Sequence, residues 1–120
     1  VGLEPQKIKE YGGFKKQGKD EAGAKKIIQA AIDLEKAGVF AVVLESIPEA
    51  LAQQITQQLT IPTIGIGAGP HCDGQVLVWH DVVGLTETPP PFAKKYFEAN
   101  QAFKQAIDSF IHEVKHKKFP

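Results

Sequence analysis

The chain has 120 residues, of which 42% are hydrophobic and 23% charged, which is typical of one soluble globular domain. Its 14 cationic residues are all lysines and are balanced by 14 Asp and Glu residues, so its net charge is zero. This balance argues against a nucleic-acid partner, and no apolar run reaches the roughly 20 residues that a membrane span requires. One cysteine, Cys72, and no recognisable secretory signal favour a cytoplasmic location.

The first third of the chain predicts a loop, a helix and a strand. Residues 1–19 contain four glycines and one proline, which predicts a long loop. Residues 20–36 are predicted to be helical, because apolar residues recur at helical spacing, Asp20 can cap the start and Gly38 follows the end. Residues 40–44 form a continuous apolar run without alternation, which is typical of a strand buried on both faces of a parallel sheet.

The rest of the chain predicts two more strands and three more helices. Pro48 suits the first turn of a second helix. Residues 61–66 are predicted as a second strand, residues 67–74 as a glycine-rich connector and residues 76–79 as a third strand. Two helices are predicted after Pro91. The last of them carries an apolar stripe at Phe103, Ala106, Ile107, Phe110, Ile111 and Val114.

This order of elements predicts an α/β protein built from parallel βα units. About three parallel strands cannot close a barrel, and a (β/α)8 barrel, or TIM barrel, typically has about 250 residues. We therefore expect residues 1–120 to be the C-terminal part of a single (β/α)8 barrel domain. The sequence contains no methionine and begins at Val1, so we expect the N-terminal strands to lie outside it.

Glu45 is the candidate catalytic residue. It ends the first predicted strand, just before the turn towards Pro48. In a (β/α) barrel the C-terminal ends of the strands form the catalytic face, and a partly desolvated carboxylate there is suited to proton abstraction. Two structural roles stay open for Glu45: pairing with a neighbouring lysine, or capping the helix that follows.

Two glycine-rich segments are candidates for contact with a substrate. Residues 65–69 follow a strand, but their spacing is not that of a dinucleotide-binding fingerprint, so a tight turn is favoured and no cofactor-binding residue is predicted. Residues 12–18 form a glycine-hinged loop with two lysines and one aromatic residue. Such a loop can close over an anionic substrate, or it can simply be a long exposed connection.

Five residues in the second half of the chain are of types that bind metals: His71, Cys72, Asp73, His80 and Asp81. Their spacing matches no zinc pattern, and adjacent residues rarely converge on one ion. We therefore predict ordinary loop and strand-end roles for them and no metal site in this chain. His80 and Asp81 remain secondary candidates, because they follow the third predicted strand on the catalytic face.

Five stretches together resemble the ketopantoate hydroxymethyltransferase family, in the order and spacing of that family. They are residues 12–18 (GGFKKQG), 42–48 (VVLESIP), 61–69 (IPTIGIGAG), 73–81 (DGQVLVWHD) and 91–95 (PFAKK). Each stretch alone is weak evidence for this family, but the five together are specific to it, and the resemblance covers nearly the whole chain.

The resemblance implies a (β/α)8 transferase that moves a hydroxymethyl group from 5,10-methylenetetrahydrofolate to the 2-oxo acid 3-methyl-2-oxobutanoate. The product, ketopantoate, leads to pantothenate and coenzyme A. The resemblance also implies a cytoplasmic homo-oligomer, a decamer, that uses Mg²⁺ with ligands on earlier strands which this chain lacks. Glu45 falls on the family's proton acceptor, which removes the C3 proton of the 2-oxo acid and forms a metal-stabilised enolate.

Two alternatives stay open. Another metal-dependent barrel enzyme for 2-oxo acids, such as a relative of the phosphoenolpyruvate mutase and isocitrate lyase group, shares the enolate chemistry but lacks the loop 12–18 beside the Glu45 segment. A non-catalytic half-barrel would instead bind a partner chain that supplies the missing strands. Under the main interpretation, residues 1–120 alone are expected to be inactive.

Overall fold

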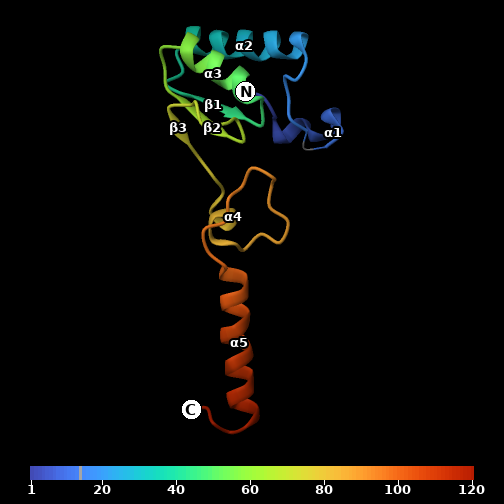
Figure 1. Cartoon of the computed structure of the whole chain (residues 1–120), viewed down its shortest axis with the longest axis vertical. Helices are drawn as coiled ribbons and strands as arrows, with labels where there is room; N and C mark the ends of the chain where they lie inside the picture. The colour runs from blue at the N-terminus through green and yellow to red at the C-terminus, as the bar shows by residue number, and fades with distance from the viewer. Residues whose placement is uncertain (14) are drawn as a thin grey trace. The chain divides into compact units, whose positions relative to one another are not determined.

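The computed structural model describes residues 1–13 and 15–120 and divides into two compact units, Val1–Val76 and Leu77–Pro120 (Figure 1). The elements of the first unit are η1 (Pro5–Lys7), α1 (Ile8–Tyr11), α2 (Glu21–Lys36), β1 (Val42–Glu45), α3 (Glu49–Gln58), β2 (Thr63–Ile66) and β3 (Gly74–Gln75). The elements of the second unit are α4 (Trp79–Val83) and α5 (Ala99–Lys115).

The first unit contains a parallel sheet with the strand order β1-β2-β3. β1 pairs with β2 along its whole length, and Glu45 lies opposite Ile66. β2 pairs with β3 in the register that sets Ile64 opposite Gly74. The predicted α/β class with three parallel strands is therefore confirmed, and this arrangement is consistent with part of a (β/α)8 barrel.

The first three residues extend this sheet on the free side of β1. The nitrogen of Val1 donates to the carbonyl oxygen of Val43 (2.6 Å), and the N–H of Leu3 donates to that of Glu45 (2.8 Å). Gly2 forms a parallel bridge with Glu45 and has a φ of 97°. A Cβ at Gly2 would overlap the carbonyl oxygen of Glu45, so glycine permits this close approach.

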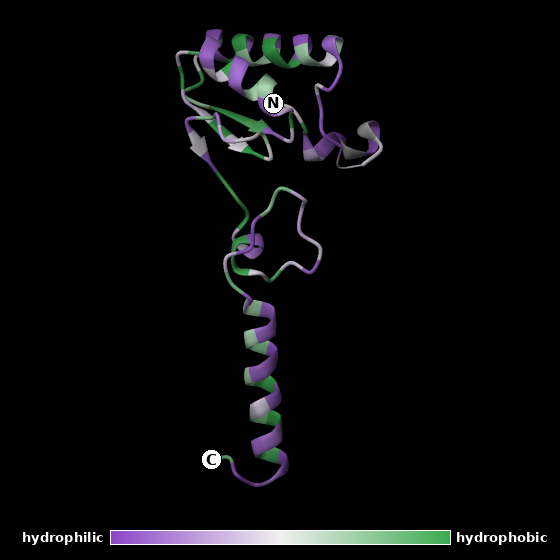
Figure 2. Ribbon diagram, viewed as in Figure 1, coloured by the Kyte–Doolittle hydropathy of each residue, from purple (hydrophilic) through white to green (hydrophobic). Residues whose placement is uncertain are grey.

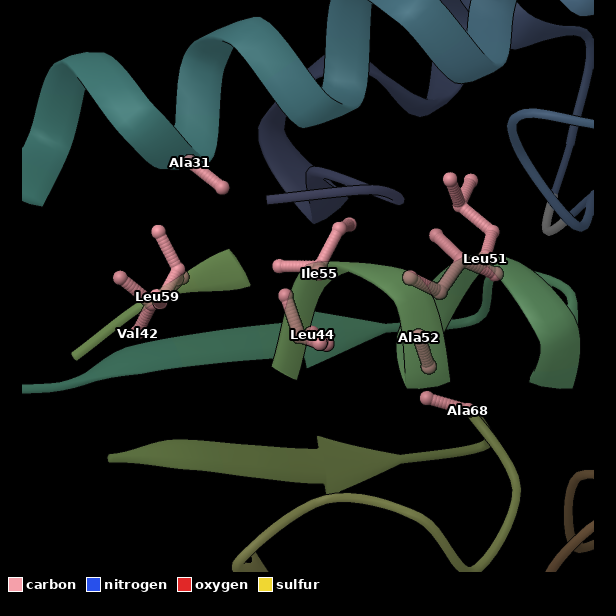
Figure 3. Packing of buried hydrophobic residues seen from close by; sticks show 9 residues of the cluster. Ala31, Val42, Leu44, Leu51, Ala52, Ile55, Leu59 and Ala68 are labelled. Atoms are coloured by element: carbon pink, nitrogen blue, oxygen red, sulfur yellow. The ribbon is translucent and has the colours of Figure 1, made fainter. Parts of the chain in front are cut away.

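The hydrophobic core lies between the sheet and the two helices α2 and α3, which cover the same face (Figures 1 and 3). Its buried residues are Ala31, Val42, Leu44, Ile47, Leu51, Ala52, Ile55, Leu59 and Ala68. Full burial of one large aliphatic side chain stabilises a fold by about 1.5–3 kcal/mol, so this cluster accounts for the position of both helices.

The other face of the sheet is less covered than the sequence predicts. Val42 and Leu44 point into the core, whereas Val43 is 43% exposed. Phe40, which the prediction placed in the strand, is 88% exposed and precedes it. The prediction of a strand buried on both faces is wrong for this chain, because the helices that pack on the sheet, α2 and α3, both lie on one side.

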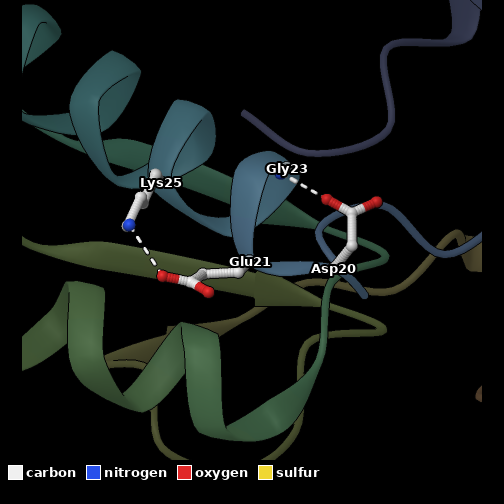
Figure 4. Close-up of polar contacts among 4 residues, drawn as sticks. All are labelled: Asp20, Glu21, Gly23 and Lys25. Atoms are coloured by element: carbon white, nitrogen blue, oxygen red, sulfur yellow. Dashed lines mark hydrogen bonds and ion pairs between the residues drawn. The ribbon is translucent and has the colours of Figure 1, made fainter.

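Helix α2 begins where the sequence predicts, and its start is stabilised by side chains (Figure 4). Asp20 accepts a hydrogen bond from the N–H of Gly23 (2.6 Å), and Glu21 pairs with Lys25 one turn later (2.7 Å). A capping side chain typically contributes about 1 kcal/mol, whereas an exposed pair of this kind contributes a few tenths.

The third strand lies earlier than predicted. β3 consists of Gly74 and Gln75, and the N–H of Val76 donates to Gly65 (3.0 Å). The chain then leaves the ladder, and the carbonyl oxygen of Val78 accepts from the N–H groups of Asp81 and Val82 as α4 begins. The apolar run that predicted a strand at 76–79 is therefore the connection into a helix.

Three other predicted boundaries differ from the structure. Residues 5–11, predicted as loop, form η1 and α1. Pro48 is the N-cap residue of α3 and lies one position before its first turn. Among the described residues after Pro91 there is one helix, α5, where two were predicted. The short helices fall below the length at which apolar periodicity can be recognised in a sequence.

The second unit contains α4, α5 and the segment that connects them. Gly84 ends α4 in the left-handed conformation, and the N–H of Tyr96 donates to the carbonyl oxygen of Val82 (2.9 Å), which folds residues 85–95 back. The predicted apolar stripe of α5 is present and exposed (Figure 2). Within residues 1–13 and 15–120 we find no helix with the length and apolarity needed to cross a bilayer.

Candidate functional site

Glu45 is the last residue of β1, at the C-terminal edge of the sheet. Its N–H donates to the carbonyl oxygen of Val1 (2.9 Å), its own carbonyl oxygen accepts from Leu3, and it lies opposite Ile66 in register. Because side chains alternate along a strand and Leu44 points into the core, the half-buried side chain of Glu45 lies on the opposite face. A rigid strand end thus presents this carboxylate.

The carboxylate of Glu45 makes no hydrogen bond or ion pair with any residue that the structure describes. The helix that follows begins at Pro48 without a side-chain cap. Neither of the two structural roles left open by the sequence is therefore seen among these residues. The arrangement leaves the carboxylate oxygens able to accept a proton from a substrate.

The residue after Glu45 has an unusual backbone conformation. Ser46 has a φ of 50°, in the left-handed region that residues other than glycine seldom adopt. Its N–H donates to the carbonyl oxygen of Ile66, and its carbonyl oxygen accepts from the N–H of Gln17, both at 2.9 Å. Such backbone strain is often found at functional sites, and here it lies beside the candidate base.

The glycine-rich segment after β2 is a tight turn, as predicted. Gly67 and Gly69 have φ values of 64° and 81°. A Cβ at Gly69 would lie 2.6 Å from the Cγ of Glu49, so the turn packs closely on the first turn of α3. The Nε2 of His71 lies 2.9 Å from the Oε1 of Glu49, which fixes the same loop at the same edge of the sheet.

Asp73 has a structural role at the opposite edge of the sheet. Its Oδ2 accepts hydrogen bonds from the N–H (2.8 Å) and hydroxyl (3.0 Å) of Thr63, the first residue of β2. These two bonds lower the pKa of the Asp73 carboxyl, and the bond from the N–H has the larger effect. The residues described contain no group of three or more His, Cys, Asp or Glu side chains that could hold a metal ion.

The lowered pKa of Asp73 gives the stability a pH dependence. Its folded-state pKa lies below the unfolded value of about 3.9. The ionised carboxylate therefore stabilises the fold above that value, and this stabilisation is lost as pH falls through the folded-state pKa. Asp73→Asn cannot ionise. We therefore expect the variant to be less stable near neutral pH and the difference to shrink below about pH 4.

Thermal unfolding midpoints of both proteins, measured between about pH 7 and pH 2.5 at one protein concentration, check this expectation. Asp33→Asn is the matched control, because Asp33 is an exposed residue of α2 whose Oδ1 accepts a bond only from the side chain of Gln29 among the residues described. If the unfolding midpoints of the unmodified protein and of Asp73→Asn differ by the same amount at every pH, that result would contradict the assigned role.

The prediction that His80 and Asp81 follow the third strand on the catalytic face is wrong. Both lie in α4 of the second unit and do not follow a strand. An acidic residue in the first turn of a helix is favoured by the helix dipole, and Asp81 occupies that position. That signal was present in the sequence, whereas nothing local in it indicates the contact between Gln17 and Ser46.

A search against protein families matches residues 1–120 to the family described as ketopantoate hydroxymethyltransferase. Curated relatives named 3-methyl-2-oxobutanoate hydroxymethyltransferase include proteins of a Cyanothece species (53% identical over 120 residues), Geobacter metallireducens (54% over 121) and Pyrobaculum calidifontis (48% over 120). Each match covers 100% of this chain. The chain spans less than half the length of these relatives, 45–46%, and matches their C-terminal portion.

Proposed function

Because the chain belongs to the ketopantoate hydroxymethyltransferase family, we propose that it supplies the C-terminal portion of an enzyme that makes ketopantoate. The substrates of this enzyme are 3-methyl-2-oxobutanoate and 5,10-methylenetetrahydrofolate, and the product serves pantothenate and coenzyme A synthesis. The observation that carries the proposal is the carboxylate of Glu45, which the end of β1 presents without a hydrogen-bond or salt-bridge partner among the described residues.

Glu45 acts as the general base in this proposal. Its carboxylate takes the proton from C3 of the keto acid, and the electron pair of the broken C–H bond forms the enolate. The enolate carbon then forms a C–C bond with the one-carbon unit as one of its two C–N bonds to the folate breaks. Water replaces the second nitrogen and supplies the new hydroxyl group. The proton taken from C3 and one proton from water end on N5 and N10 of the tetrahydrofolate that leaves. General base catalysis by a positioned side chain typically contributes about 10²–10⁴-fold to the rate.

The proposed enzyme is a (β/α)8 barrel, and residues 1–120 form the C-terminal part of its single domain. The face of the sheet that carries Val43 and Glu45 then becomes the inside of the barrel. Two observations support this part: the sheet is parallel, and Val43 is 43% exposed on the face that α2 and α3 leave uncovered. The inward-pointing side chains of such barrels form a packed interior.

Mg²⁺ belongs to the proposed enzyme through the family resemblance. On the same resemblance, we propose that its ligands lie on earlier strands of the barrel. No step above depends on a metal held by this chain. The homo-oligomer, the decamer and the cytoplasmic location are proposed on the resemblance as well.

A chimera tests the proposal. Residues 1–120 replace the matching C-terminal portion of the Cyanothece relative, which is 53% identical over this length. We expect the chimera to form ketopantoate from the two substrates, as measured by mass spectrometry against the unmodified Cyanothece protein. A chimera that folds and assembles normally but forms no ketopantoate would contradict the proposal and favour a different 2-oxo acid or a non-catalytic role.

A further inference from the structure

The connection between the N-terminal strand segment and α2, of which the structure describes residues 4–13 and 15–19, lies at the same edge of the sheet as Glu45. It begins beside β1, contains η1 and α1, and α1 lies beyond the C-terminal end of β1 (Figure 1). Gln17 attaches it to Ser46 through a backbone hydrogen bond of 2.9 Å. Binding residues are often found on loops that a scaffold positions, so this segment, hereafter the basic loop, is a candidate for contact with a ligand.

The charge of the basic loop is strongly unbalanced. It contains five lysines and two glutamates, in a chain whose net charge is zero. Glu4 is already paired with Lys7 (2.7 Å). The other four lysines are exposed and make no ion pair with a residue that the structure describes: Lys9 in α1, and Lys15, Lys16 and Lys19 after it.

The acidic residues that follow the basic loop do not neutralise it. Asp20 accepts the N–H of Gly23 as the cap of α2, and Glu21 pairs with Lys25. The loop itself is held in place at its end, because a Cβ at Gly18 would lie 2.7 Å from the Cδ2 of Leu51 on α3. The segment that carries Lys15, Lys16 and Lys19 is therefore attached, through Gln17 and Gly18, beside the turn that follows the candidate base.

A group of unpaired ammonium ions beside a reaction site raises the local concentration of anionic ligands. Of the two proposed substrates, the keto acid is small and reacts at Glu45, on the face of the sheet. The folate is long, and its glutamate tail carries carboxylates far from the one-carbon unit. Lysine ammonium groups act as separate point charges, which suits several carboxylates along a flexible tail better than one bidentate contact.

We propose that Lys15, Lys16 and Lys19 bind the carboxylates of the glutamate tail of the folate substrate, an inference that rests on the proposed function. The basic loop recognises one end of the folate, while Glu45 acts where the other end delivers its one-carbon unit. The loop then favours folates with several glutamates over folates with one.

The test uses the chimera and its Lys15→Gln/Lys16→Gln/Lys19→Gln variant. KM is measured for 5,10-methylenetetrahydrofolate with one glutamate and with five glutamates. We expect the unmodified chimera to prefer the longer tail and the variant to lose about tenfold in that preference, from three exposed charge interactions of a few tenths to 1 kcal/mol each. Raised ionic strength should weaken the preference of the unmodified chimera, because exposed charges are screened.

Two further variants complete the test. Lys115→Gln/Lys117→Gln/Lys118→Gln removes the same charge at the end of α5, and we expect it to keep the preference. Lysine-to-arginine changes at the three loop positions keep the charge and should keep the preference too. If the loop variant retains the preference, or if the α5 variant loses as much, the proposal is overturned.

A separate readout distinguishes this inference from the proposed function. Exchange of the C3 proton of the keto acid needs no folate and depends on Glu45. Loss of that exchange in the unmodified chimera would count against the proposed function itself. A loop variant whose KM rises for the keto acid, with the folate preference intact, would assign the lysines to the smaller substrate and overturn the inference.

Discussion

Replacing Leu44 with alanine is expected to destabilise the first unit by about 2–5 kcal/mol. Leu44 is fully buried, in the strand that both α2 and α3 cover (Figure 3). The substitution removes apolar contacts and leaves a cavity that the surrounding helices and strands can fill only partly. Since a typical domain is stable by only about 5–15 kcal/mol, this is the largest effect on stability that we expect from a single change.

Denaturant unfolding of residues 1–120, followed by circular dichroism at one protein concentration, measures this loss. Val43→Ala is the matched control, because Val43 is the neighbouring residue on the other face of the strand and is 43% exposed. If Leu44→Ala does not fold, Ile55→Val is the milder probe of the same core, with an expected loss of about 0.5–1.5 kcal/mol. Equal losses at Leu44 and Val43 would contradict a core that lies on the helix side alone.

Much of the first unit could be predicted from its sequence, because apolar periodicity reports burial directly. The stripe along residues 20–36 and the capping side chain of Asp20 specify α2, and the apolar runs near residues 42 and 63 specify β1 and β2. The parallel pairing follows from the helix between them. The apolar residues that form this pattern in the sequence also pack in the core and stabilise these elements.

The later elements could not be predicted in the same way. Val76, Val78 and Trp79 are residue types typical of strands, yet the ladder ends at the N–H of Val76 and a helix follows. The actual strand, Gly74–Gln75, has neither an apolar run nor alternation. It pairs with the backbone of β2, so no local pattern of apolar residues indicates it.

The candidate site shows the same division. The position of Glu45 at the end of a strand could be predicted from the apolar run before it, and that position makes it a candidate because strand ends form the catalytic edge of a barrel. The left-handed conformation of Ser46 and its contact with Gln17 depend on hydrogen bonds between segments that are far apart in the sequence. Those contacts attach the basic loop to the site, and they follow only from the folded backbone.

Glu45→Gln is expected to suppress catalysis of proton removal by about 10²–10⁴-fold. The amide keeps the size of the side chain and much of its hydrogen bonding but cannot accept a proton. The substitution breaks no ion pair or hydrogen bond of that side chain among the described residues, so we expect the fold and keto acid binding to persist. A structural role for Glu45 would instead predict loss of stability with catalysis largely intact.

Glu49→Gln is the matched control for this change. Glu49 lies at the same edge of the sheet, in the first turn of α3, and its carboxylate is paired with His71. The same loss of one carboxylate there should leave proton removal close to that of the unmodified chimera. Thermal unfolding of all three proteins then separates an effect on chemistry from an effect on folding.

The rate at which the C3 proton of 3-methyl-2-oxobutanoate exchanges with deuterated water is the most direct measurement of Glu45 as the base. Proton NMR follows this exchange in the chimera without folate, which isolates the single step assigned to Glu45. We expect the Glu45→Gln chimera to exchange about 10²–10⁴-fold more slowly than the unmodified chimera. Near-normal exchange in a well-folded Glu45→Gln chimera would remove Glu45 from the role of base.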